Sequence, residues 1–163
     1  MKCFIIAAIT ADGFIAKDKN HAAMWTSKED KKRFVELTKR AGVVVMGSTT
    51  FATLPKPLKD RVNIVYSKSK TFEGAEVTTG EPKDLLQKLE ARGFSEVAIC
   101  GGASIYTKFM EAGVVDTIYL TVEPLLFGKG LSLFEKSFES KLIMKDCVKT
   151  ETGTLLLEYS VAN

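Results

Sequence analysis

The stretch 96–110 constrains the fold of this chain more than any other part of the sequence. Residues 97–100 form a short apolar run, typical of a strand buried on both faces of a parallel sheet, and the run stops at Gly101-Gly102. Apolar residues then recur at helical spacing, at Ile105, Phe109 and Met110. Paired glycines between a strand and a helix let a ligand approach the backbone, where free N–H groups face an anion such as a phosphate. The same pair also makes a simple tight turn, so the motif alone leaves both interpretations open.

The rest of the chain repeats this alternation of strand and helix. Strand patterns occur at 3–9, 43–46, 62–66, 76–79 and 117–122, and helical patterns at 27–41, 47–54 and 82–92. The tail alternates like a hairpin, at 141–148 and 153–161. We therefore predict one α/β domain over residues 1–163. It is a three-layer sandwich with a central, mostly parallel sheet, helices on both faces and a C-terminal antiparallel hairpin. Ligands in such sheets bind beyond the carboxyl ends of the strands.

Charge and cysteine content exclude several classes of function. The net charge is +3, with basic and acidic residues interleaved, which argues against a nucleic-acid partner. The N-terminal apolar run is too short to span a membrane, and we expect a cytoplasmic protein. Cys3, Cys100 and Cys147 lie far apart and the chain has one histidine, His21, so we expect neither a metal site nor a disulfide. Each cysteine lies in an apolar run and is predicted to be a small buried hydrophobe.

An acidic residue stands at a core-facing position of the helix at 27–41. Asp30 lies four residues before Phe34 and seven before Leu37, whereas the charged residues, Arg33 among them, fall mostly on the solvent side. One interpretation is structural: Ser27 caps the helix, and Asp30 is favourably placed in its positive first turn. The other is a carboxylate in an apolar pocket that binds N–H groups of a ligand and assists protonation, with a pKa raised by desolvation. Spacing does not decide between them.

Several motifs together resemble the dihydrofolate reductase family. They are MWTSKEDKKRF at 24–34, VMGSTTF at 45–51, KPLKDRVNI at 56–64, ICGGASIY at 99–106 and IYLT at 118–121. They occur in the order, and with nearly the spacing, of the folate reductases, and they cover most of the chain. The resemblance implies an enzyme that reduces 7,8-dihydrofolate to 5,6,7,8-tetrahydrofolate, by hydride transfer to C6 and protonation at N5. The resemblance therefore also implies that the enzyme acts in tetrahydrofolate biosynthesis and one-carbon metabolism.

The resemblance also implies a role for each matching residue at the substrate. Asp30, Trp25 and Thr121 are the implied catalytic set: Asp30 binds the pterin and promotes protonation, Thr121 helps to hold that end, and Trp25 orders a water molecule. The implied substrate-binding residues are Ile6, Ala8, Asp30, Phe34, Leu54, Leu58, Arg61 and Cys100. Arg61 would take the α-carboxylate of the substrate as a bidentate pair. Without the resemblance, a surface arginine that leads into a strand is the ordinary interpretation.

The implied cofactor is NADPH. Its implied contacts are Ala8, Ile15, Gly47, Ser48, Thr49, Thr50, Ser67, Lys68, Cys100, Gly101, Gly102, Ala103, Ser104, Ile105 and Tyr106, and in the family the glycine–glycine peptide is cis. Ser48 and Ser104 depart from the family, which places basic residues there to recognise the 2′-phosphate. Lys68 and Lys70 are available to supply that charge, which favours NADPH over NADH.

Two rival functions stay open. Segments 12–16, 115–124 and 126–130 also resemble the reductase domain of riboflavin biosynthesis, which shares the fold and reduces a ribosylamino-pyrimidine phosphate with NADPH. The set of Asp30, Phe34, Leu58 and Arg61 favours folate. The serines at the phosphate site and a longer loop at 17–24 suggest the third possibility, a nucleotide-binding module without catalysis. The sequence leaves the protein open between monomer and homodimer.

Overall fold

Eight strands form the central sheet in the order β5-β4-β3-β6-β1-β7-β10-β9, and the computed structural model describes residues 1–162. The strands are β1 (Lys2–Thr10), β3 (Val43–Gly47), β4 (Val62–Tyr66), β5 (Glu76–Thr78), β6 (Glu96–Ile99), β7 (Thr117–Glu123), β9 (Leu142–Lys149) and β10 (Leu155–Val161). From β5 to β7 all neighbouring strands are parallel. β10 runs antiparallel to both β7 and β9, which confirms the predicted C-terminal hairpin.

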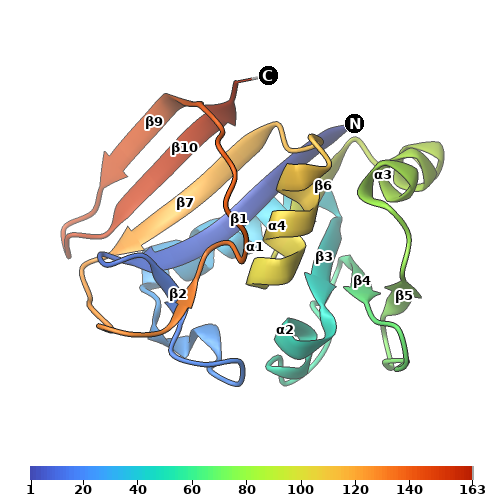
Figure 1. Cartoon of the computed structure of the whole chain (residues 1–163), viewed down its shortest axis with the longest axis horizontal. Helices are drawn as coiled ribbons and strands as arrows, with labels where there is room; N and C mark the ends of the chain where they lie inside the picture. The colour runs from blue at the N-terminus through green and yellow to red at the C-terminus, as the bar shows by residue number, and fades with distance from the viewer. Residues whose placement is uncertain (163) are drawn as a thin grey trace.

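Helices cover both faces of the sheet. They are α1 (Lys28–Ala41), α2 (Ser48–Ala52), α3 (Pro82–Ala91) and α4 (Ala103–Glu111). In Figure 1, α4 lies in front of the sheet and α1 behind it. The side chains of α3 and α4 pack into one core and those of α1 and α2 into another, so the predicted three-layer sandwich is confirmed. Among residues 1–162 no helix has both the length and the apolar character needed to cross a membrane.

The continuous apolar runs of the sequence arise because the inner strands serve both cores. Successive side chains of a strand point to opposite faces, so β1 directs Cys3 and Ile5 toward α3 and α4, and Phe4 and Ile6 toward α1 and α2. All four are nearly inaccessible to solvent. A strand buried on both sides needs apolar residues at every position, and this is why the inner strands were predictable.

Some short elements were not predicted. Strands β2 (Phe14–Ala16) and β8 (Leu131–Ser132) pair in a second, two-stranded sheet, and η1 (Ala23–Trp25) is a single 3₁₀ turn in the polar loop. β2 and β8 are far apart in the chain, and neither has enough residues to show a period. Gly130 allows them to meet, because a Cβ atom there would collide with the carbonyl oxygen of Ala16. The pairing brings the segment after β7 over the N-terminal turn.

Two predicted side-chain environments are wrong. Cys147 is exposed rather than buried, because no residue of β9 packs into either core and all eight are exposed. Arg33 is half-buried rather than on the solvent side. Its guanidinium donates to the carbonyl oxygens of Leu120 and Leu157, at 3.4 and 2.7 Å, and thereby joins α1 to β7 and β10. Helical spacing places a residue on a face, but it does not report where the neighbouring sheet extends beyond the helix.

A conservative truncation tests the double-sided burial of the inner strands. Ile99→Val on β6, where Ile99 is fully buried, is expected to lower the free energy of unfolding by about 1 kcal/mol, because one methylene is lost from a packed core. Ile143→Val, the same change on β9 at a residue that is 48% exposed, is expected to have a much smaller effect. Urea denaturation measures both, and equal losses would contradict the assigned burial.

Candidate active site

A cavity of about 660 Å³ opens at the carboxyl ends of the inner strands. Its floor includes Ile6 to Ala8 on β1, Gly47 at the end of β3, and Cys100 after β6. The volume lies in the range of small-molecule and cofactor sites. The cavity therefore lies where the topology of a parallel α/β sheet predicts a ligand.

Asp30 lies both in the capped first turn of α1 and in the lining of the cavity. Its backbone N–H donates to Ser27 Oγ at 3.2 Å, so Ser27 is the N-cap of α1 and Asp30 lies in the first turn. Its side chain also lines the cavity and is only 9% exposed. Burial raises the pKa of Asp30 above its ordinary value, while the nearby hydroxyls of Thr121 and Thr26 oppose the rise. The carboxyl group is thus held inside the cavity in a form that protonates more readily than a solvated aspartate.

Trp25 lines the same cavity as Asp30 and has an unused hydrogen-bond donor. Its indole Nε1 is buried and has no partner among residues 1–162. Phe127, from the segment after β7, packs edge-on against the indole, with ring centroids 5.1 Å apart. An orphaned buried donor next to a cavity indicates a place for a water molecule or a polar ligand atom.

A stripe along α1 leads from Asp30 to a cation. Asp30, Phe34 and Thr38 follow one another at intervals of four residues on one face of the helix, which places Asp30 and Thr38 about 12 Å apart along its axis. Arg61 Nη1 donates to Thr38 Oγ1 at 2.9 Å, and its Nε donates to the carbonyl of Lys59 at 2.8 Å. Among residues 1–162 no carboxylate forms an ion pair with Arg61. The stripe therefore has an acid at one end, an aromatic ring in the middle and an unpaired cation at the other end.

Glycines bring the backbone to the opposite side of the cavity. The Gly101–Gly102 peptide is cis, and Gly101 has a φ of 117°, which favours glycine. A Cβ atom at Gly102 would lie 3.1 Å from Thr50 Oγ1, and one at Gly47 would lie 3.3 Å from Ile105 Cγ1. Gly102 is the N-cap of α4 and provides no side-chain cap, so the first N–H groups of the helix stay available to a ligand. This cradle fits the phosphates of a nucleotide cofactor.

The structure brings most of the predicted site residues together. Those that line the cavity are Ile6, Ala8, Ile15, Trp25, Asp30, Phe34, Gly47, Ser48, Thr49, Thr50, Cys100, Gly101, Gly102, Ala103, Ser104, Ile105 and Tyr106. Thr121 lies behind Asp30 and is buried. Leu54 and Leu58 pack with Phe34 in the core next to α1, and Arg61 lies at the end of the stripe. Ser67 and Lys68, at the end of β4, are outside the cavity lining.

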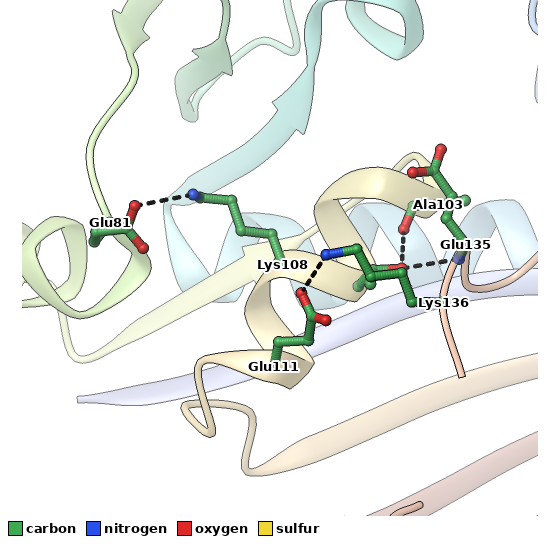
Figure 2. Close-up of polar contacts among 7 residues, drawn as sticks. Glu81, Ala103, Lys108, Glu111, Glu135 and Lys136 are labelled. Atoms are coloured by element: carbon green, nitrogen blue, oxygen red, sulfur yellow. Dashed lines mark hydrogen bonds and ion pairs between the residues drawn. The ribbon is translucent and has the colours of Figure 1, made fainter. Parts of the chain in front are cut away.

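Other lining residues were missed. Tyr66 and Thr26 lie next to predicted positions, while Lys19, His21, Phe134 and Glu135 come from the two segments that form the rim. The rim segment after β8 is fixed to α4: Glu135 N donates to Thr107 Oγ1 at 2.9 Å, and Lys136 Nζ lies 3.2 Å from Glu111 Oε2 (Figure 2). On its other side, α4 is tied to the residue before α3 by Lys108 and Glu81, 3.3 Å apart (Figure 2). No local pattern marks these residues, because tertiary contacts alone bring them to the cavity.

The described part of the chain contains no group of three or more histidine, cysteine, aspartate or glutamate side chains placed to hold a metal ion. Cys100 faces the cavity, but burial raises the pKa of its thiol to about 12, which makes it a poor nucleophile at neutral pH. Asp30 is a buried carboxyl group in the cavity lining, and its raised pKa makes it a candidate acid–base group.

The fold and the cavity define an α/β protein in which a glycine cradle faces a buried carboxyl group across one cavity. Comparison of the sequence with family models gives the family. The model described as "Dihydrofolate reductase" matches residues 2–125, and the chain belongs to the dihydrofolate reductase family.

Individual relatives agree on the family and differ in their printed functions. The chain is 33% identical to "Dihydrofolate reductase type 9" of Escherichia coli over 144 residues, which are 82% of this chain and 78% of that protein. A putative riboflavin biosynthesis protein from Shewanella sp. PV-4 has a similar structure, with a TM-score of 0.82, 21% identity and full coverage of both chains. A deaminase/reductase of Thermotoga maritima, named for a phosphoribosylamino-pyrimidine and a phosphoribosylamino-uracil, gives a TM-score of 0.80 at 17% identity, over 99% of this chain and 56% of that one. At these identities the two structures show the fold alone.

Proposed function

We propose that this protein reduces 7,8-dihydrofolate to 5,6,7,8-tetrahydrofolate with NADPH. The observation that carries the proposal is the stripe on α1: Asp30 at one end, Phe34 in the middle and the unpaired Arg61 at the other end. Dihydrofolate has the complementary order, with N–H groups on the pterin, an aromatic ring in the centre and a carboxylate beyond it. An unpaired, half-buried guanidinium is a good partner for that carboxylate, because it binds in a bidentate manner.

The residues of the chain orient the substrate and control one proton. Asp30 accepts hydrogen bonds from the 2-amino and N3 groups of the pterin and promotes protonation at N5. Thr121 and Trp25 position that end, directly and through water. Phe34, Leu54 and Leu58 contact the flat rings, while Ile6, Ala8 and Cys100 form the floor. The burial that raises the pKa of Asp30 also excludes water from the reacting centre.

NADPH fits the glycine side of the cavity. Gly47, Gly101 and Gly102 leave the backbone open, and the free N–H groups at the start of α4 face the cavity. Ser48, Thr49, Thr50, Ala103 and Ser104 add short side chains that can hydrogen-bond or pass close to phosphates. When bound, the cofactor supplies the hydride for C6 of the pterin. We assign the charge near the 2′-phosphate to Lys68, which follows β4 next to Ser67.

A folate analogue provides the test. Methotrexate, at a concentration a hundred times its dissociation constant, is expected to raise the melting temperature by about 5 °C or more, because it binds only the folded state. NADPH oxidation in the presence of dihydrofolate, followed by absorbance, is expected to be saturable and to be inhibited by methotrexate. An unchanged melting temperature at saturating methotrexate would contradict the assignment.

A second candidate substrate is a ribosylamino-pyrimidine phosphate. The observation that favours it is the cavity rim, where Lys19 and His21 stand near the mouth and could face a phosphate. The loop that carries Phe127 and Gly128 is held to the rim by Asp12, whose carboxylate accepts from both backbone N–H groups, at 3.2 and 2.7 Å. This substrate is reduced in the same assay if the second candidate is correct, and dihydrofolate is then not reduced.

A further inference from the structure

Glu123 is a buried carboxylate that the site described so far does not use. It ends β7, two residues after Thr121, and is 5% exposed. None of the lysine and arginine side chains described in residues 1–162 forms an ion pair with it. A buried carboxylate without a cation is costly unless hydrogen bonds satisfy its oxygens. Its position therefore calls for a physical explanation.

Three donors converge on this carboxylate. Oε1 accepts from the backbone N–H of Ser27 at 3.1 Å and from its hydroxyl at 2.7 Å, and Oε2 accepts from the Thr154 hydroxyl at 2.9 Å. Hydrogen bonds from Ser27 and Thr154 therefore satisfy both oxygens. Glu123 thus joins the end of β7 to the start of α1 and to the turn before β10.

The contact with Ser27 reaches Asp30. A serine hydroxyl has one proton, and here it is donated to Glu123, so the lone pairs of Ser27 Oγ remain free to accept from the Asp30 N–H at 3.2 Å. Glu123, which lies outside α1, therefore orients the hydroxyl of Ser27 that caps the helix. We propose that Glu123 is a positioning residue for Asp30, acting through Ser27 on the first turn of α1. The proposal rests on the proposed function, in which Asp30 is the acid of the site.

The charge of Glu123 adds a second effect. Three titratable groups interact electrostatically with Asp30. They are Glu123 on β7, Arg33 on the same helix as Asp30, and Tyr106 on α4. Burial is the main cause of the raised pKa of Asp30, the Thr121 and Thr26 hydroxyls and Arg33 oppose it, and the negative charge of Glu123 raises it further. A neutral residue at position 123 is therefore expected to make Asp30 ionise at lower pH.

Glu123→Gln tests both effects, because it keeps the size of the side chain and removes its charge. We expect kcat with dihydrofolate to fall about tenfold at pH 7, because a displaced acid group aligns poorly with its substrate, with a smaller change in KM. We also expect Asp30 to titrate at lower pH. The readout is the carboxyl carbon resonance of Asp30 in protein with ¹³C-labelled aspartate, assigned by its loss in Asp30→Asn. An Asp30 titration that is the same in Glu123→Gln and in the wild type would overturn the proposal.

Asp116→Asn is the matched control. Asp116 stands just before the other end of β7, and its carboxylate accepts from the backbone N–H of Cys3 at 2.8 Å. The same loss of charge there is expected to leave the Asp30 titration unchanged, and an equal shift would overturn the proposal. The titration needs no substrate, so it decides the role of Glu123 even if the wild type fails to reduce dihydrofolate, a result that overturns the proposed function alone.

Glu123→Asp provides an independent test if the glutamine variant does not fold. Aspartate keeps the charge but is one methylene shorter, so it cannot hold Ser27 and Thr154 in the same way. We expect kcat to fall about tenfold while Asp30 still titrates close to its wild-type pH. Wild-type kcat in folded Glu123→Asp would overturn the positioning role.

Discussion

Asp30→Asn is expected to reduce kcat for dihydrofolate at least about a hundredfold, because the variant loses the general-acid contribution of the buried carboxyl group that lines the cavity. Asparagine has nearly the same shape and can still form hydrogen bonds, so the fold and the cavity should persist. Steady-state oxidation of NADPH, followed by absorbance, measures the effect. Asp146→Asn, the same change on the exposed strand β9, is the control and should leave turnover unchanged.

The pH dependence of kcat gives the same prediction a second test. Burial raises the pKa of Asp30, so the protonated form persists to higher pH than in a solvated aspartate. If this form assists protonation, wild-type kcat is constant at low pH and falls as the pH rises through the raised pKa. The fall should be absent from Asp30→Asn. Wild-type turnover in Asp30→Asn, or a pH dependence of kcat that is the same in Asp30→Asn and in the wild type, would contradict the role of Asp30.

Arg61→Leu is expected to lower kcat/KM for dihydrofolate by about thirty- to a hundredfold, because a bidentate, charge-assisted contact with the substrate carboxylate is lost. The loss should appear mainly in KM, because this end of the substrate lies away from the reacting atoms and binds equally in the ground state and the transition state. Measurement of kcat and KM separately, over a range of dihydrofolate concentrations, tests this division.

Two further arginine variants sharpen the result. Arg61→Lys keeps the charge without the planar fork and should give an intermediate KM. Arg92→Leu removes a surface arginine that already pairs with Glu76 at 2.8 Å, and it should leave KM unchanged. A KM that is the same in Arg61→Leu and the wild type would show that this guanidinium does not bind the substrate, and it would favour a substrate without the distal carboxylate.

The sequence predicted the sheet and both helical layers because the responsible forces are local and periodic. Strand β3, and β1 from Cys3 to Ile9, are apolar at every position, since both faces of the inner strands are buried, and α1 shows its stripe through the spacing of Phe34 and Leu37. Asp30 was identifiable for the same reason: an acid in an apolar stripe breaks the period. The structure shows that its two alternatives were not exclusive, because Asp30 lies both in the capped first turn and in the cavity.

Residues whose positions depend on distant contacts could not be predicted. Cys147 has the sequence context of a buried strand residue, and it is exposed because neither of the two cores extends over β9. Glu123 follows an apolar strand and looks like the start of a solvated loop, yet Ser27 and Thr154 enclose it. The rim residues Phe134 and Glu135 reach the cavity only because Thr107 and Glu111 hold their segment on α4. None of these pairings leaves a local pattern.

A crystal structure of the protein with NADP⁺ and folate bound would test the central claim most directly. We expect the pterin 2-amino and N3 groups within hydrogen-bond distance of the Asp30 carboxylate, the glutamate α-carboxylate on Arg61, and the nicotinamide on the glycine side of the cavity. A complex in which the pterin lies away from Asp30, or in which folate does not enter the cavity, would contradict the account.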